Sequence, residues 1–240
     1  MNNLSYEHII LCFLFAAGGT VGGWALTGTF AGEDAALSFF CIGTVVVLMM
    51  SAAQFVLYSL GRRRLIYRLV LNIVFACGVV WFMLCLLLPL LWVPSVSVAE
   101  KIILFSFFSA LCASNIIRAG KQFREKWGAE AEHALAKNHN IKKCTLDWPK
   151  VLATMKFSLR LYVPGVPESL SPLIALLMLV SMIAGLSFRN VFPSFSLFAW
   201  GIPTCLVISI FMQMIGLGIA QIVKLLALEK RYGAPIGPKD

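Results

Sequence analysis

The chain has 240 residues, of which 60% are hydrophobic and only 13% are charged, and its mean hydropathy is +0.86. A soluble domain cannot bury so large an apolar fraction, so the composition excludes an ordinary soluble protein and indicates a polytopic membrane protein. The net charge of +9 does not indicate nucleic-acid binding, because the basic residues are not interleaved with stacking aromatic residues and no binding module is recognisable.

Six apolar runs are long enough, at about 1.5 Å per residue, to cross a hydrocarbon core about 30 Å thick. We predict spanning helices over about residues 9–30, 36–60, 69–93, 101–117, 169–187 and 196–222. The predicted fold is an all-α integral membrane protein with six transmembrane helices and a helical cytoplasmic hairpin between the fourth and fifth. Residues 1–117 would hold spans one to four, residues 118–168 the cytoplasmic loop, and residues 169–240 spans five and six with a short cytoplasmic tail.

Two ridges of small residues occur in the first apolar run. Gly18 and Gly22 are four positions apart, and so are Gly19 and Gly23. Residues four apart share one face of a helix, and glycine lets a second backbone approach closely in lipid. We therefore predict that all four glycines are helix-packing residues. Two alternatives stay open, since the ridges could pack against another helix of the same chain or against a different protein.

The predicted spans contain neutral amides rather than ionisable side chains. Gln54, Asn72, Asn115 and Gln213 lie within spans, whereas no Asp, Glu, Lys, Arg or His lies well inside one. Ionisable residues within a membrane usually mark ion paths or proton relays, so their absence argues against proton-coupled transport. Neutral amides more often join helices by hydrogen bonds than bind ligands.

The loop of residues 118–168 carries an amphipathic pattern. Phe123, Trp127 and Leu135 recur at fourfold spacing, so the fourth span is predicted to continue as a helix out of the membrane. Asp147 would then cap a second helix over about Trp148–Tyr162.

The apolar side of this second helix could lie at the level of the lipid headgroups, dock on the first loop helix as a helical hairpin, or bind a partner protein. All three alternatives make the same residues candidates for partner or membrane-surface contact: Phe123, Trp127, Leu135, Trp148, Leu152, Met155 and Leu159. A weaker ridge of small residues follows in the sixth span, where Gly216 and Ala220 are four positions apart and are predicted to pack against a helix.

The basic residues are distributed unevenly over the connections. If the N-terminus lies in the cytoplasm, 18 of the 20 Lys and Arg residues fall on the cytoplasmic side, and only Lys101 and Arg189 fall outside. Because Lys and Arg are retained on the cytoplasmic side when loops are short, we predict an even number of spans with both termini cytoplasmic. This topology and attraction to anionic lipids would together account for most of the basic residues.

No pattern typical of catalysis or metal binding occurs. The three histidines and Cys144 match no zinc spacing, and the seven cysteines include no CxxC pair. The sequence also contains no nucleophile elbow, no HExxH motif and no phosphate-binding glycine loop. We therefore predict that the protein is not an enzyme and has no catalytic residues, metal or cofactor.

These patterns favour a non-enzymatic accessory protein that binds a larger membrane assembly. The assembly could be secretion or conjugation machinery, or the protein could have an immunity or exclusion role in which it occupies a membrane partner. The expected partners are other membrane proteins, a further copy of this chain included, and anionic lipids, but no nucleic acid. The alternative is a small uncoupled transporter or channel subunit, with the neutral amides along its path. Short hydrophilic segments and the lack of sorting signals favour a bacterial inner membrane.

Overall fold

The structure, a computed structural model, describes residues 6–61, 63–140, 144–188 and 190–239. Four residues of the charge count, Arg62, Lys142, Lys143 and Arg189, lie outside the described residues. Among the described residues, five helices are long and apolar enough to cross a membrane, which is compatible with a membrane-embedded all-α protein. They are α1 (Tyr6–Ala31), α2 (Glu33–Gly61), α3 (Leu65–Leu84), α4 (Val98–Lys126) and α8 (Pro193–Tyr232).

The fifth predicted span corresponds to a shorter helix. This helix, α7 (Ser171–Ser187), has 17 residues. At about 1.5 Å per residue it is about 25 Å long, which is less than a hydrocarbon core of about 30 Å. It follows η2 (Glu168–Leu170), a single 3-10 turn, and packs against α8. The described helices confirm the all-α class. The count of six spans stays a prediction, because α7 is short.

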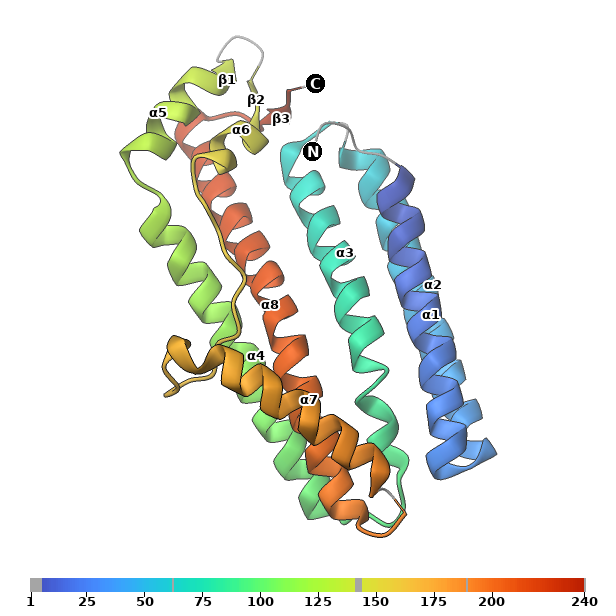
Figure 1. The fold of residues 1–240 in the computed structure, drawn as a ribbon. Helices are drawn as coiled ribbons and strands as arrows, with labels where there is room; N and C mark the ends of the chain where they lie inside the picture. The colour runs from blue at the N-terminus through green and yellow to red at the C-terminus, as the bar shows by residue number, and fades with distance from the viewer. Residues whose placement is uncertain (1–5, 62, 141–143, 189, 240) are drawn as a thin grey trace.

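The long helices pack in two groups joined through α3 and α8. Contacts connect α1, α2 and α3 with one another, whereas α8 contacts α3, α4 and α7. Figure 1 shows that the described termini lie at the same end of the bundle, which we call the terminal end. The connections from α1 to α2 and from α7 to α8 lie at the opposite end.

A single glycine reverses the chain between α1 and α2. Gly32 has a φ of +92°, a left-handed conformation that residues with a side chain rarely adopt. Its N–H donates to the carbonyl of Gly28, and its own carbonyl accepts the N–H of Ala36. The last turn of α1 and the first turn of α2 are therefore both closed by this residue.

The third predicted span, residues 69–93, is broken rather than continuous. The helix α3 ends at Leu84, and the chain turns into the 3-10 helix η1 (Leu88–Trp92). Pro89 explains the break, because proline has no N–H and clashes with the preceding helical turn. Nearby, the Lys101 ammonium donates to the carbonyls of Leu91 at 2.9 Å and Val93 at 2.8 Å. One of the two basic residues predicted to lie outside thus stabilises this turn.

A small module caps the terminal end. As predicted, the fourth helix continues beyond residue 117, but α4 ends at Lys126 and does not run on to Leu135. Trp127 caps its end and Gly128 begins a separate helix, because glycine favours the break. The helix α4 is followed by α5 (Ala129–Asn138), β1 (His139–Asn140), β2 (Thr145–Leu146) and α6 (Trp148–Ala153). After α8 the tail contributes β3 (Gly237–Pro238), which pairs in parallel with β2, while β1 pairs with β2 in the antiparallel sense.

The predicted helix over Trp148–Tyr162 is wrong beyond Ala153. The side chain of Asp147 does cap α6 by accepting the N–H of Lys150, but the helix has only six residues. Residues 154–163, which we call the strap, then run without helical structure along α4 and α8 (Figure 1). Pro164 disfavours helical conformation at Val163, directly before it, so it accounts for the end of the strap and not for the helix end at Ala153.

Two groups of buried hydrophobic side chains hold the fold together. The central core lies between α3, α4 and α8 and includes Val80, Leu104, Leu111 and Ile208. The terminal-end core joins the module to the long helices. Its buried members are Leu65, Leu69, Phe123, Ala131, Leu135, Leu146, Trp148, Val151, Met155, Leu225, Leu228 and Ile236.

Candidate functional site

One glycine row of α1 packs inside the chain. A Cβ atom at Gly19 would lie 2.7 Å from the Cα atom of Phe82, closer than real Cβ atoms approach backbone. At Gly23 it would collide with the ring of Phe39 and lie 3.1 Å from the Cβ atom of Cys85. These two glycines therefore allow α1 to approach both α2 and α3. This is the first of the two alternatives left open for the ridges.

The other glycine row of α1 faces away from the chain. A Cβ atom at Gly18 or Gly22 would meet no atom within 4 Å among the described residues. Both residues are exposed, as are Leu14 and Val21 beside them. The row is therefore a smooth strip on the outer surface of the bundle, bordered by large apolar side chains.

The ridge in the last long helix packs against α4. A Cβ atom at Gly216 would lie 2.6 Å from the carbonyl oxygen of Ile116 and 3.0 Å from the Cβ atom of Ala119. Ala220, one turn further along, is half-buried against the terminal-end core. These glycine and alanine positions bring α8 close to α4 over the last turns before the module.

The candidate contact residues of the loop lie mostly in the interior of the terminal end. Phe123, Leu135, Trp148 and Met155 are buried members of the terminal-end core, and Trp127 and Leu152 are partly buried against it. Leu159, in the strap, is the exposed residue of the set. The structure thus brings six of the seven residues together around one core that α3, α8 and the tail also supply.

A polar network fastens the module to α8. The indole N–H of Trp127 donates to Glu132 Oε1 at 2.6 Å, and the Lys224 ammonium donates to the same oxygen at 3.2 Å. Lys224 also lies 4.2 Å from the centroid of the Trp127 ring. The Trp127 indole, and next the Lys224 ammonium, hold the pKa of the Glu132 carboxyl below its usual range, against the opposing effect of burial. Beside them the indole of Trp148 donates to Gln221.

Two buried amides of the bundle bind the strap. The Gln213 amide N–H donates to Asn115 Oδ1 at 2.6 Å and to the carbonyl of Arg160 at 2.7 Å. The Asn115 amide donates to the carbonyl of Tyr162 at 3.2 Å and to that of Leu111 in its own helix. Non-helical backbone at membrane depth is tolerated only where its polar groups are satisfied or wet. The amides supply donors to two such carbonyls of the strap.

The other two amides of the spans differ from this pair. Gln54 is 1% exposed, and among the described residues neither of its amide atoms has a hydrogen-bond partner by distance and angle. Asn72 lies on the exposed side of α3. The four amides therefore do not form a continuous polar path, and each of Asn115 and Gln213 is engaged with the chain's own backbone.

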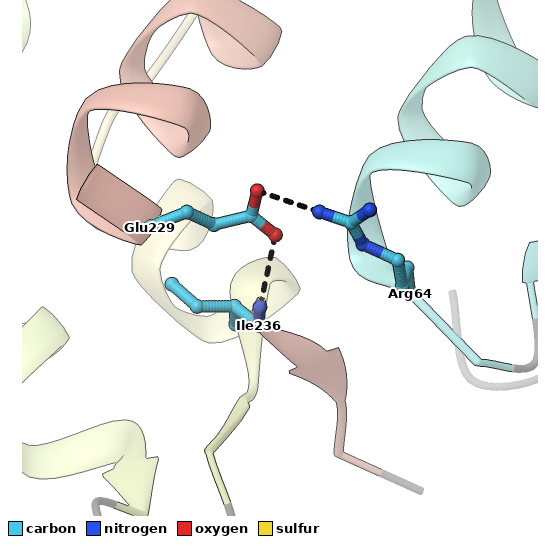
Figure 2. Close-up of polar contacts among 3 residues, drawn as sticks. All are labelled: Arg64, Glu229 and Ile236. Carbon is cyan, nitrogen blue, oxygen red and sulfur yellow. Dashed lines mark hydrogen bonds and ion pairs between the residues drawn. The ribbon is translucent and has the colours of Figure 1, made fainter. Parts of the chain in front are cut away.

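The tail is clamped between the two groups of helices (Figure 2). Glu229 Oε2 accepts a hydrogen bond from Arg64 at 3.0 Å, while Oε1 accepts the backbone N–H of Ile236 at 2.9 Å. The carbonyl of Ile236 in turn accepts the N–H of Leu65. A residue at the end of α8, one before α3 and the buried side chain of Ile236 are thereby held together.

Comparison with known proteins finds no match for this chain, either among family models or among curated proteins and solved structures. Within the described ranges, no three His, Cys, Asp or Glu side chains are grouped in a way that could hold a metal ion. The contacts described above supply surfaces for helix packing and for hydrogen bonding.

Sequence reasoning missed the strap and the tail clamp. A signal for the strap exists, because Pro164, Gly165 and Pro167 lie close together and break helices. No comparable signal marks the clamp. Arg64 and Glu229 are 165 positions apart in the sequence, so only the packing of α3 beside α8 reveals their contact.

Proposed function

We propose that the protein is a non-enzymatic accessory protein that binds a helix of another membrane protein along the outward glycine row of α1. The observation that carries this proposal is the open space at Gly18 and Gly22. In lipid, apolar surface alone does not drive helices together, and close backbone packing at small residues does. A row of two glycines on the outer surface offers that packing without any rearrangement of the chain.

The placement of the loop residues supports the same choice. Six candidate residues of the loop lie around the terminal-end core, so their side chains serve the fold of this chain. The inward glycines, Gly19 and Gly23, are occupied by α2 and α3. Of the candidate packing residues in α1, Gly18 and Gly22 are the pair left for a partner.

The finer parts of the proposal concern orientation and setting. Both termini would lie in the cytoplasm, because the charge count places 18 of the 20 basic residues there. The terminal-end module would then be cytoplasmic, and α7 would complete a sixth span together with part of the strap. A bacterial inner membrane, an assembly of the secretion or conjugation type, and an immunity or exclusion role remain predictions from the sequence.

The experiment compares two substitutions that each introduce leucine at an exposed position on the outer surface. Gly22→Leu fills the open row, whereas Ala52→Leu adds the same side chain to an exposed position of α2. Native membranes are solubilised in mild detergent, and the protein is followed by native electrophoresis. We expect wild type and Ala52→Leu to migrate in a complex larger than the 26.4 kDa chain, and Gly22→Leu to migrate alone.

Three results would overturn the proposal, the third of them its accessory role. One is an unchanged complex for Gly22→Leu and for Gly18→Leu, because either leucine would hold two backbones apart. The second is a wild-type protein that migrates alone after extraction under several mild conditions. If the complex contains this chain only, the accessory role is overturned and the row becomes a self-association surface.

The alternative function is a small uncoupled transporter or channel subunit. The short helix α7 and the non-helical strap favour it, because broken membrane segments often surround transport sites. In that case flux of a small neutral solute into liposomes that contain only this protein should be lost in Asn115→Leu. Unchanged or undetectable flux for wild type and Asn115→Leu alike would remove this alternative.

A further inference from the structure

A strip of positive charge follows α4 and the strap where they leave the apolar part of the bundle. Residues 118–126 and 154–163 together contain six basic residues and one acidic residue, Glu125. The basic residues, which we call the basic strip, are Arg118, Lys121, Arg124, Lys126, Lys156 and Arg160. Glu125 lies 3.7 Å from Lys121, and both side chains are largely exposed, so this pair neutralises little of the strip.

The strip begins at the depth where lipid headgroups would lie. Lys101 and Arg118 bracket the apolar part of α4, a helix of 29 residues that is long and apolar enough to cross a membrane. The first charge of the strip therefore follows directly on the apolar part of the span. Ile117, directly before Arg118, is 67% exposed on the outer surface. Leu159 of the strap is 42% exposed. Aliphatic side chains that face outward therefore adjoin the first positive charges.

Aromatic rings fix the positions of the charges. The Arg118 guanidinium carbon lies 4.1 Å from the centroid of the Tyr162 ring. One end of the strap is held in place by the Lys126 ammonium, which donates to the carbonyl of Lys156 and lies 5.3 Å from the centroid of the Phe157 ring. Tyrosine at the boundary between apolar and polar surface is typical of membrane interfaces. The strap thus keeps two cations ordered along one side of α4.

From this arrangement we infer that the surface formed by the basic strip on α4 and the strap binds an anionic phospholipid. The headgroup phosphate would lie against Arg118 and its neighbours in the basic strip, and an acyl chain would lie along the exposed aliphatic surface next to it, such as Ile117 of α4. Charge complementarity and the adjoining aliphatic side chains favour a lipid over a soluble anion, because a soluble anion would not contact the apolar surface. The inference goes beyond the partner surface proposed on α1, because the lipid would contact α4 and the strap instead.

The experiment uses the full chain in lipid nanodiscs made either of phosphatidylcholine or of phosphatidylcholine with phosphatidylglycerol. Native mass spectrometry measures which lipids stay bound after release. We expect wild type to retain phosphatidylglycerol preferentially. In Arg118→Gln with Lys126→Gln, the preference should fall about thirtyfold, because each basic residue near an anionic surface contributes about a factor of five.

The matched control is Lys137→Gln with Lys239→Gln, which removes the same charge from exposed positions on α5 and the tail. This variant should retain the wild-type preference. An equal loss in both variants would overturn the site and leave general surface attraction. The absence of any preference in wild type would also overturn it, and so would a rise in thermal stability with inorganic phosphate alone in detergent.

A second double substitution keeps the test valid if the first variant misfolds. Lys121→Gln with Lys156→Gln changes two exposed side chains and leaves the contact between Arg118 and Tyr162 intact. It should lower the preference for phosphatidylglycerol while the circular dichroism spectrum stays that of wild type. The inference would be contradicted if this variant and a correctly folded first variant both kept the wild-type preference for phosphatidylglycerol.

Discussion

Adjacent glycines of α1 have opposite surroundings, and this contrast gives a test at the scale of single residues. Gly19→Leu should lower the free energy of unfolding by about 1–3 kcal/mol or more, as overpacking does, because the backbone of Phe82 cannot move aside easily. Gly18→Leu should leave it unchanged, because a Cβ atom there meets nothing within 4 Å. Unfolding of the purified protein in detergent measures both. Equal stability of the two variants would contradict the packing of α1 against α3.

The buried amides give a second comparison between single residues. Gln213→Leu should destabilise the protein by about 1–3 kcal/mol, because the carbonyl of Arg160 loses its donor inside the bundle. Gln54→Leu should leave stability equal or raise it, because the buried amide has no hydrogen bond of good geometry and only a weak thiol partner, Cys12, and is replaced by an apolar side chain of similar size.

Thermal unfolding in detergent, with intact helical content checked by circular dichroism, measures both amide variants. A lower stability for Gln54→Leu than for Gln213→Leu would reverse the assignment. It would indicate that Gln54 has a partner such as bound water and that the strap does not depend on Gln213.

At the scale of elements, the docking of α5 on α8 should depend on pH. The Trp127 indole and the Lys224 ammonium stabilise the charged form of Glu132, so its pKa in the folded protein is lower than the ordinary 4.5. The stabilisation is therefore complete above that ordinary value and is lost as the pH falls through the lower, folded value.

Hydrogen exchange along α5, followed from neutral pH to below 4.5, measures this effect. Exchange in α5 should speed up on acidification beyond the intrinsic pH dependence, while exchange in α1 should not. Glu132→Gln should remove the difference. An identical pH profile in Glu132→Gln and wild type would show that the carboxylate does not hold the module.

The strap shows how neighbouring elements override local preference. Leu159 and Leu161 are good helix formers in isolation, and the spacing of Trp148, Leu152, Met155 and Leu159 suits one helical face. In the structure Trp148 and Met155 do reach the terminal-end core, but from either side of the helix end at Ala153. Apolar spacing alone cannot distinguish the two arrangements.

At the scale of the whole molecule, the clamp at the tail joins the two groups of helices, so its removal should affect global stability. Glu229→Ala should lower the free energy of unfolding by about 1.5–3 kcal/mol, because the side chain is only 10% exposed and accepts hydrogen bonds from Arg64 and Ile236. Thermal unfolding in detergent measures it.

The control for the clamp is Glu125→Ala, which removes an exposed ion pair with Lys121 and should change stability by no more than about 0.5 kcal/mol. If the two alanine variants were equally stable, the contacts of Glu229 with Arg64 and Ile236 (Figure 2) would have no effect on the stability of the fold. If Glu229→Ala alone were destabilised, the tail would be part of the structural core.

The sequence by itself determined the all-α class, most of the long apolar helices, the continuation of α4 beyond residue 117 and the residue types available for packing. It could do so because apolar length and fourfold spacing are local properties of the chain. Only the tertiary structure decided that Gly19 and Gly23 face inward while Gly18 and Gly22 face outward, since the two ridges are equivalent in sequence. It likewise decided the burial of Leu135 and Trp148, the capture of the strap by Asn115 and Gln213, and the clamp at Glu229. Each depends on which helix lies opposite, and that is set by contacts between residues far apart in the chain.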